Sequence, residues 1–411
     1  MSLSMPGYDV LVDVTPLGTL SRFKGIGTYV RELERALAKL RADELSGLKI
    51  GSLVGFDRGR PRVEALSEAR RFEVDATDLH AGARGYIWRR RLLLGQALRR
   101  SGARLVHLPE PLGMPVGSGV PRVVTCHDLI PLRFPQWYLS RRFPLARLRR
   151  RFHDRARFGS ARRVLADSEA TARDLVSMLG IPESRIDVVY PGIDLERFRP
   201  QAETCEKERL QALFGLDRPY LLYVGAGDPR KGIDTLVRAH ARVAASHDLL
   251  LVLAGKLEPR YRQALDRTIH EYGRADLIRC LDFVPGDTLP ALYRQCLVFA
   301  LPSHAEGFGL PLAEAMACGA PSIASSAGSL PEVAGDGALL VRPGDDGALA
   351  EVVARLSDDS GLRRRLIECG PAVASQFSWD RCARAVMTCY LRALGLTAGA
   401  ARPGAGSRGS S

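Results

Sequence analysis

Short apolar runs alternate along the chain with segments of helical periodicity. Strands are predicted at 8–14, 50–54, 104–108, 122–126, 163–166 and 187–189, and in a second series at 220–225, 249–254, 277–283, 298–301, 322–324 and 338–341. Strands that alternate with helices in this way are typical of parallel sheets joined by crossover helices. The pattern therefore predicts an α/β protein built from two such series.

Helices are predicted between these strands. The first has its apolar positions at steps of four and three, which places them on one face: Ile26, Val30, Leu33, Leu37 and Leu40. Another is expected to begin after the capping residue Ser168 and to end at Gly180. Further helices are expected near 232–245, 260–272, 288–295, 311–318, 346–357, 360–368 and 379–394.

The chain length favours two domains, because 411 residues exceed the size at which a single core keeps growing. We predict a first domain over 1–200 and a second over 201–378, joined through 190–200 and the polar segment 201–209. A last helix over 379–395 is expected to pack on the first domain, and the Gly- and Ser-rich tail over 397–411 is expected to be disordered. No secretory signal pattern and no apolar run of ~20 residues is visible, so we expect a cytoplasmic protein.

The net charge of +13 implies an acidic partner: nucleic acid, an anionic membrane surface or a phosphorylated substrate. The excess is arginine in the first half, and it lacks the interleaved aromatics of nucleic-acid-binding surfaces. From Arg141 to Arg163, arginines alternate with Phe143, Leu145, Leu148, Phe152 and Phe158. This composition fits a basic helix lying on an anionic membrane, or a core-packed helix with a solvated arginine face.

The segment 303–319 carries the clearest candidate chemistry. It follows a predicted strand, passes through a glycine-bearing loop and begins a helix with Pro311 in its first turn. Backbone amides at such a helix start bind negative charge or sugar hydroxyls, and here they belong to Phe308, Gly309 and Leu310. Glu306 and Glu314 flank this position, although an isolated pair of glutamates would as readily be a helix cap and a surface charge.

The run Glu-Gly-Phe-Gly-Leu-Pro at 306–311, followed by Glu-Ala-Met-Ala-Cys-Gly-x-Pro at 314–321, resembles the signature of the group 1 or family 4 retaining glycosyltransferases. Other motifs similar to this family follow in order at 24–29, 127–131, 167–171, 190–194, 223–225, 229–232, 253–256, 283–285 and 329–333. The resemblance covers nearly the whole chain. It implies the GT-B architecture, with two facing Rossmann-like domains and the active site in the cleft between them.

Some residue roles follow from the resemblance and agree with the chemistry. A nucleotide diphosphate leaving group accumulates negative charge, and Arg230 and Lys231 match the residues that contact the phosphates in the family. Glu314 resembles the ribose-binding glutamate, and Glu306 lies where the donor sugar would bind, able to hold its hydroxyls or stabilise a cationic ring. His127 resembles the histidine that touches the donor sugar, although a lone histidine is usually structural.

The remaining donor contacts are expected from loops. The glycines Gly25 and Gly27 open the first helix and offer a second backbone approach to the phosphates, while Phe283 and Val284 would border the base. Ala226 stands where relatives have an arginine, which leaves the phosphate contact to Arg230. No Asp-x-Asp pair follows a strand, so we expect neither a metal nor a cofactor.

The sequence therefore predicts a retaining, metal-independent hexosyltransferase with a nucleotide diphosphate sugar donor and a lipid-linked or polysaccharide acceptor. Its loops at 25–29 and 127–131 resemble those of bacterial polysaccharide mannosyltransferases, which suggests GDP-mannose as the donor. The alternatives are a sugar-nucleotide epimerase or a phosphorylase of the same architecture, and, from another class, a basic nucleic-acid-binding protein. A phosphorylase would need a pyridoxal-binding lysine and a longer chain.

Overall fold

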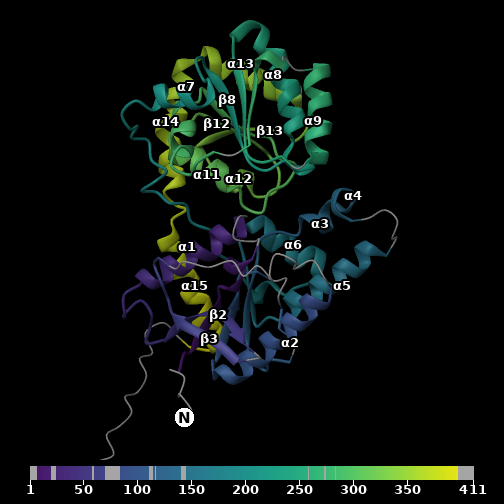
Figure 1. Cartoon of the computed structure of the whole chain (residues 1–411), viewed down its shortest axis with the longest axis vertical. Coiled ribbons are helices and arrows are strands. Elements are labelled where there is room, and N and C mark those ends of the chain that lie inside the picture. Colours follow the sequence, from purple (N-terminus) through teal and green to yellow (C-terminus); the bar gives the residue numbers. More distant parts are fainter. Residues whose placement is uncertain are drawn as a thin grey trace, which may run out of the picture.

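The computed structural model describes residues 7–19, 25–57, 60–69, 84–110, 114–115, 117–139, 145–257, 259–272, 275–282 and 284–396. They form two α/β units, each with a central sheet between helices, stacked along the long axis of the molecule (Figure 1). The predicted fold class is confirmed. Among the described residues, no helix combines the length and the apolar composition that a bilayer crossing requires.

The described strands of the first sheet lie in the order β3-β2-β1-β4-β5-β6-β7. Their bounds are β1 (Val10–Asp13), β2 (Ile50–Asp57), β3 (Arg60–Ala65), β4 (Leu105–Leu108), β5 (Arg122–Cys126), β6 (Arg163–Ala166) and β7 (Ile186–Val188). Neighbours are parallel, except that β3 pairs antiparallel with β2. The sequence did not predict β3, because this edge strand is largely exposed and has no apolar run to mark it.

Helices cover both faces of this sheet. Helices α1 (Gly25–Lys39) and α15 (Trp379–Leu394) pack on one face, and α2 (Arg84–Ser101), α5 (Ala146–Gly159) and α6 (Glu169–Leu179) pack on the other. The ends predicted for α6 are confirmed: the Ser168 hydroxyl accepts from the Thr171 amide at 3.0 Å, and Gly180 ends the helix at φ +64°. In α1, the predicted apolar face is buried through Val30, Leu33 and Leu37.

Several short elements complete the first domain. They are η1 (Thr15–Gly18), α3 (Ile130–Arg133), α4 (Pro135–Tyr138) and η5 (Glu183–Arg185). Helices α3 and α4 follow β5 and project from the first domain on the side that faces the second (Figure 1).

The second sheet is parallel throughout its described strands, in the order β10-β9-β8-β11-β12-β13. The bounds are β8 (Tyr220–Val224), β9 (Leu250–Ala254), β10 (Ile278–Leu281), β11 (Val298–Leu301), β12 (Ser322–Ser325) and β13 (Ala338–Val341). Helices α8 (Ile233–His247), α9 (Pro259–Tyr272) and α13 (Asp346–Asp358) pack together on one side. On the other side lie α7 (Glu206–Phe214), α10 (Leu289–Gln295), α11 (Leu310–Ala317), α12 (Leu330–Ala334) and α14 (Ser360–Ala374), and the turns η6 (Pro229–Lys231) and η7 (Ala275–Leu277) link strands to helices.

The prediction that all of 201–209 connects the two domains is wrong for residues 206–209, which are helical. Helix α7 begins at Glu206, whose carboxylate is buried and accepts from Arg294 Nε at 3.0 Å. The polar composition hid this packing, because the charge that suggested a linker is neutralised by a partner far along the chain. Residues from 206 onward therefore belong to the second α/β unit.

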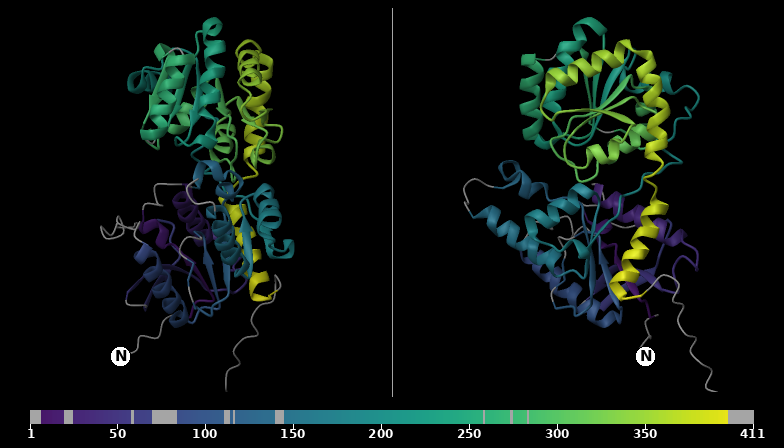
Figure 2. Two further views of the ribbon diagram at one scale, coloured as in Figure 1. Left: turned by 90° about the vertical axis from the view of Figure 1, so that its right-hand side faces the viewer. Right: turned by 180° about the vertical axis from the view of Figure 1, so that it is seen from behind.

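The chain crosses between the two units twice, and the two crossings lie side by side. The Ile193 amide donates to the Phe377 carbonyl at 2.9 Å. At Gly192 the backbones are so close that a Cβ atom would lie 2.2 Å from the Trp379 amide nitrogen, so only glycine fits. After the second crossing, α15 descends along the first sheet (Figure 2), where Val386 and Tyr390 are buried in the core that α15 shares with α1.

Candidate active site

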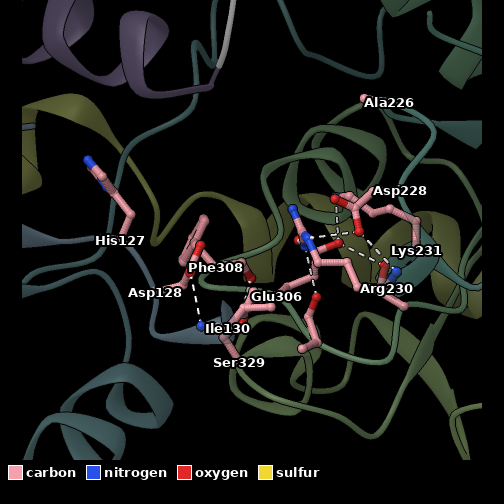
Figure 3. Close-up of polar contacts among 12 residues, drawn as sticks. His127, Asp128, Ile130, Ala226, Asp228, Arg230, Lys231, Glu306, Phe308 and Ser329 are labelled. Atoms are coloured by element: carbon pink, nitrogen blue, oxygen red, sulfur yellow. Dashed lines mark hydrogen bonds and ion pairs between the residues drawn. The ribbon is translucent and has the colours of Figure 1, made fainter. Parts of the chain in front are cut away.

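A buried carboxylate lies between two cations in the second domain (Figure 3). Arg230 and Lys231 belong to η6, just after β8, and Glu306 follows the neighbouring strand β11. Glu306 Oε2 accepts from Arg230 Nη1 at 2.7 Å, and Oε1 accepts from Lys231 Nζ at 2.6 Å. The Ser303 hydroxyl donates to Oε1 at 2.7 Å. Ligands of open α/β sheets bind at the carboxyl ends of strands, which is where this cluster lies.

The cluster holds two cations around one buried carboxylate. Only 6% of the Glu306 side chain is exposed, and burial would raise the pKa of this carboxyl; Lys231 and Arg230 instead lower it to about 2. Burial lowers the pKa of Lys231, against the pull of Glu306. Burial also opposes the charged form of Arg230, but Glu306 raises its pKa overall. Asp228 Oδ1 lies 3.8 Å from Arg230 Nε and adds a second, partly exposed carboxylate beside the cluster. Two preorganised cations at this position are suited to a diphosphate.

The turn that carries the cations is held on both sides of Arg230. The Asp228 carboxylate accepts from the Arg230 amide at 3.0 Å, and the His304 amide donates to the Arg230 carbonyl at 2.6 Å. Gly232 then starts α8 at φ +66°, at a point where a Cβ atom would lie 2.4 Å from the Pro302 carbonyl oxygen. Ala226 precedes this turn and brings no charge to it, as the sequence indicated.

The loop before α11 presents backbone rather than side chains. Gly309 caps the helix at φ +101°, and the Phe308 side chain is buried against the rings of Tyr190 and Phe377. The Ser329 hydroxyl donates to the Phe308 carbonyl at 2.8 Å and thereby fixes the loop. The first amides of a helix have no partner within it. A donor-binding role for Phe308, Gly309 and Leu310 stays a prediction that concerns their backbone.

Glu314 lies one turn into α11 and accepts from the Tyr293 hydroxyl at 3.1 Å. Burial raises the pKa of Glu314 to about 7, although Tyr293 and Arg197 act in the opposite direction. Phe283 and Val284 were predicted to border the nucleotide base. Val284 is half-buried, and Phe283 lies outside the described residues. Ribose binding by Glu314 remains a prediction.

The raised pKa of Glu314 gives donor binding an expected pH dependence. The protonated acid accepts fewer hydrogen bonds than the carboxylate, so a ribose with two adjacent hydroxyls should bind the ionised form more tightly. The donor KM should therefore fall as the pH rises from about 6 to 8, across the value near 7. Glu314→Gln does not titrate, and its donor KM should be higher and flat over this range. A wild-type KM that does not change with pH would contradict the assignment.

His127 directly follows β5, and its ring is hydrogen-bonded within the first domain. Nδ1 lies 2.7 Å from the Asp167 carboxylate, Nε2 lies 2.9 Å from the Pro109 carbonyl oxygen, and the Tyr29 ring packs edge-on at 4.9 Å. Burial lowers the pKa of His127, but Asp167 raises it more, so the ring favours the charge.

The structure does not bring the His127 ring together with the Glu306 cluster, from which it lies apart in Figure 3. Instead the His127 backbone faces the second domain: a Cβ atom at Gly307 would lie 2.0 Å from the His127 carbonyl oxygen. Contact between the ring and a donor sugar stays a prediction. So does phosphate binding by Gly25 and Gly27, which lie in the first turn of α1 as the motif indicates.

Glu332 joins the two domains, and sequence reasoning missed it. Its carboxylate accepts from the Glu169 amide at 2.9 Å and the Ala170 amide at 3.0 Å, at the first turn of α6, and from the Tyr190 hydroxyl at 2.9 Å. A carboxylate is favourable at a helix N-terminus. The motif at 329–333 indicated a specific segment, but its partners are about 140 to 160 residues away in the chain, so no local pattern could show this contact.

Both halves of the chain match models of glycosyltransferase domains. Residues 23–197 match the model described as Glycosyltransferase Family 4, and residues 205–373 match the one described as Glycosyl transferases group 1. The chain belongs to this family. The expected family is thereby confirmed, and the cluster of Glu306, Arg230 and Lys231 lies in the group 1 half of this glycosyltransferase.

Individual proteins that are similar to this chain also carry glycosyltransferase names. The chain is 34% identical over 292 residues to D-inositol 3-phosphate glycosyltransferase of Salinispora arenicola, a match that covers 66% of this chain and 63% of that enzyme. It is 29% identical over 385 residues to O-antigen chain mannosyltransferase B of Escherichia coli, covering 89% and 95%. The chain thus spans less than two thirds of the inositol-phosphate enzyme, whereas it spans nearly all of the mannosyltransferase.

The fold of the glycosyltransferase matches solved structures over almost its whole length. Sucrose-phosphate synthase from Thermosynechococcus elongatus aligns with a TM-score of 0.73 and 25% identity, covering 94% of this chain and 98% of that one. This match confirms the architecture of two facing α/β domains.

Proposed function

We propose that this glycosyltransferase moves a hexose, with retention, from a nucleotide diphosphate sugar to a lipid-linked or polysaccharide acceptor. The observation that carries the proposal is the buried cluster of Glu306, Arg230 and Lys231, which holds two cations where β8 and β11 end, in a position suited to a diphosphate. In the transfer, the bond between the anomeric carbon and the phosphate oxygen breaks, and the acceptor oxygen bonds to the same face. The nucleoside diphosphate leaves with the electron pair, and its freed phosphate oxygen takes the proton of the acceptor hydroxyl.

The proposed donor is GDP-mannose. Support comes from the extended similarity to a protein named as an O-antigen mannosyltransferase, which the chain matches over 95% of its length. The test is incubation of the purified protein with GDP-mannose, UDP-glucose and related donors, followed by measurement of nucleoside diphosphate release. An epimerase of the same fold would return an altered sugar nucleotide and no stoichiometric glycosylated product.

Transfer is expected to survive chelation of divalent metals. The proposed role of Arg230 and Lys231 is to neutralise the charge that other glycosyltransferases neutralise with a bound cation. Turnover in excess EDTA should equal turnover in added Mg²⁺, with a metal-dependent glycosyltransferase assayed in parallel as the control. Loss of activity that Mg²⁺ restores would contradict the metal-independent mechanism.

Helix α5 supports a second part of the proposal, that the first domain docks on the anionic inner face of a membrane to reach its acceptor. Its apolar residues divide into two groups: Phe158 is buried in the core, whereas Leu145, Leu148 and Phe152 are 63–70% exposed. Residues 141–144, including Phe143, lie outside the described residues.

Basic side chains surround this apolar surface of α5. Arg147, Arg149 and Arg151 are exposed, whereas Arg150 is ion-paired to the buried Asp154. An apolar surface with arginines around it is the composition of an interfacial helix, so it favours membrane docking over a purely solvated face.

Vesicle binding is expected to depend on both kinds of side chain on α5. The protein should sediment with phosphatidylserine-containing vesicles at low salt and not with neutral phosphatidylcholine vesicles, and each exposed arginine contributes about 1 kcal/mol near an anionic surface. The triple change Arg147→Ser, Arg149→Ser and Arg151→Ser should abolish most of this binding, and so should Leu148→Ser with Phe152→Ser. Arg150 is kept because its loss would leave Asp154 without its partner.

A matched control removes the same charge elsewhere. Arg267, Arg364 and Arg365 are exposed arginines of the second domain, and replacing all three with serine should leave vesicle binding intact. Equal loss in both triple variants would indicate an effect of net charge alone. If the wild-type protein does not bind anionic vesicles at low salt, the proposal of membrane docking is contradicted.

A further inference from the structure

Helix α4 of the first domain contacts the second domain through two side chains. The Tyr138 hydroxyl donates to Asp228 Oδ1 at 2.6 Å, although the two residues are 90 positions apart in the chain. The centroids of the Trp137 and His304 rings lie 5.5 Å apart. The Trp137 ring also stacks on the Phe134 ring, with a centroid distance of 4.7 Å. These contacts form where α3 and α4 project toward the second domain (Figure 1).

The two residues that α4 contacts, Asp228 and His304, are also hydrogen-bonded to the backbone of Arg230. Asp228 accepts from the Arg230 amide at 3.0 Å, and the His304 amide donates to the Arg230 carbonyl at 2.6 Å. Helix α4 therefore contacts two residues that are hydrogen-bonded to the Arg230 backbone: Asp228 in the same turn, through Tyr138, and His304 after β11, through Trp137.

We propose that Tyr138 and Trp137 are positioning residues for the diphosphate-binding turn, which the first domain completes through Asp228 and His304. The inference rests on the proposed function, since it assigns the turn to a nucleoside diphosphate. It makes the alignment of Arg230 depend on the two domains being together.

The hydrogen bond from Tyr138 to Asp228 is suited to holding the two domains in one arrangement. Burial raises the pKa of Tyr138, and the Asp228 carboxylate raises it further, so the hydroxyl keeps its proton and donates. A hydrogen bond to a carboxylate is stronger than one between neutral groups. Catalytic groups must be held within about 0.5 Å of their productive geometry. Loss of this bond therefore releases the carboxylate that caps the Arg230 amide.

The test is a double-mutant cycle read by calorimetric titration with GDP and with UDP. Tyr138→Phe removes only the hydroxyl and should weaken binding of whichever diphosphate the wild type prefers about 10-fold. Asp228→Ala, which removes the acceptor, should weaken it by a similar factor or more. The double variant should be no more than about 2-fold weaker than Asp228→Ala alone, because both changes remove the same hydrogen bond. Tyr272→Phe, at an exposed tyrosine of α9, is the matched control and should bind as the wild type does.

A second readout separates positioning from general damage. The nucleoside monophosphate with the same base should bind Tyr138→Phe within about 2-fold of the wild type, because it lacks the β-phosphate that the cations hold. Trp137→Leu should show the same selective loss for the diphosphate, and the melting temperature of both variants should stay close to that of the wild type.

Each other outcome overturns the inference. Additive effects in the cycle, equal losses for monophosphate and diphosphate, or unchanged diphosphate binding in Tyr138→Phe would show that Tyr138 does not act through Asp228 on the phosphate turn. If the wild type binds a diphosphate and Tyr138→Phe binds it equally well, the inference alone fails. If the wild type binds neither GDP nor UDP, the proposed function fails and the inference falls with it.

Discussion

Replacing Lys231 with alanine is expected to lower turnover about 100-fold or more, and replacing Arg230 is expected to do the same. Each side chain is a preorganised positive group near the oxygen that gains charge as the diphosphate leaves, and removing one such donor typically costs about 3 kcal/mol of transition-state stabilisation. Their rigid attachment to Glu306, at 2.6 and 2.7 Å, means that little reorganisation precedes the reaction. Steady-state release of nucleoside diphosphate under saturating donor measures the effect.

Two exposed cations of the same domain provide controls for this experiment. Lys207 on α7 and Arg267 on α9 are exposed to solvent, and their alanine variants should keep wild-type turnover. Circular dichroism should show that all four variants remain folded. Wild-type turnover in Lys231→Ala or Arg230→Ala would contradict the assignment of that residue to diphosphate binding.

Loss of the Glu306 carboxylate is expected to affect both turnover and stability. Glu306→Gln leaves the buried Lys231 without its anion and the half-buried Arg230 with only Asp228, and breaking a buried ion pair typically costs about 3–5 kcal/mol of folding stability. The cations also lose the geometry that directs them at the diphosphate, so kcat should fall about 100-fold, whereas Glu314→Gln should mainly raise the donor KM. The reverse pattern would mean that the roles of the two glutamates are exchanged.

A second variant separates the two effects of Glu306. In Glu306→Gln with Lys231→Met, one cation is removed together with the anion, so the net charge of the cluster returns to that of the wild type. Its melting temperature should recover relative to Glu306→Gln, while its turnover stays low. A double variant no more stable than Glu306→Gln would contradict the stabilising role of the pair between Glu306 and Lys231.

The pH window of this stabilisation follows from the direction of the shift. The pKa of Glu306 is lowered from 4.5 to about 2 in the folded protein, so its contribution is fully present above about pH 4.5 and is lost as the pH falls toward 2. Kinetic measurements near neutral pH therefore compare variants in a range where the wild-type cluster stays ionised.

The fold could be predicted from sequence because its signals are local. Apolar runs mark most of the buried strands, and Ser168 and Gly180 mark the two ends of α6 by capping chemistry that needs only nearby residues. The failures have the opposite character. Strand β3 is largely exposed and lacks the apolar pattern of the other strands, and the start of α7 depends on an ion pair between Glu206 and Arg294, 88 positions away.

The site was predictable in its residue types but not in its pairings. The motifs indicated Glu306, Arg230 and Lys231 separately, as a sugar contact and two phosphate contacts, yet a sequence cannot show that strand order places η6 beside the end of β11. The same limit concealed Tyr138 and Glu332, whose partners belong to the other domain. The sequence likewise could not show that Asp167, 40 positions further along the chain, is hydrogen-bonded to the His127 ring; contact of that ring with a donor sugar stays a prediction.

The packing of α15 on the first sheet sets an order of events during synthesis. The core of the first domain is complete only when Val386, Tyr390 and their neighbours have left the ribosome, after the second sheet has been made. The second domain is continuous in sequence and can fold as soon as it emerges, since domains fold as units during translation. The N-terminal part of this polypeptide therefore keeps an uncovered apolar face while the second domain is being made, and a product that ends before Trp379 lacks the helix that covers this face.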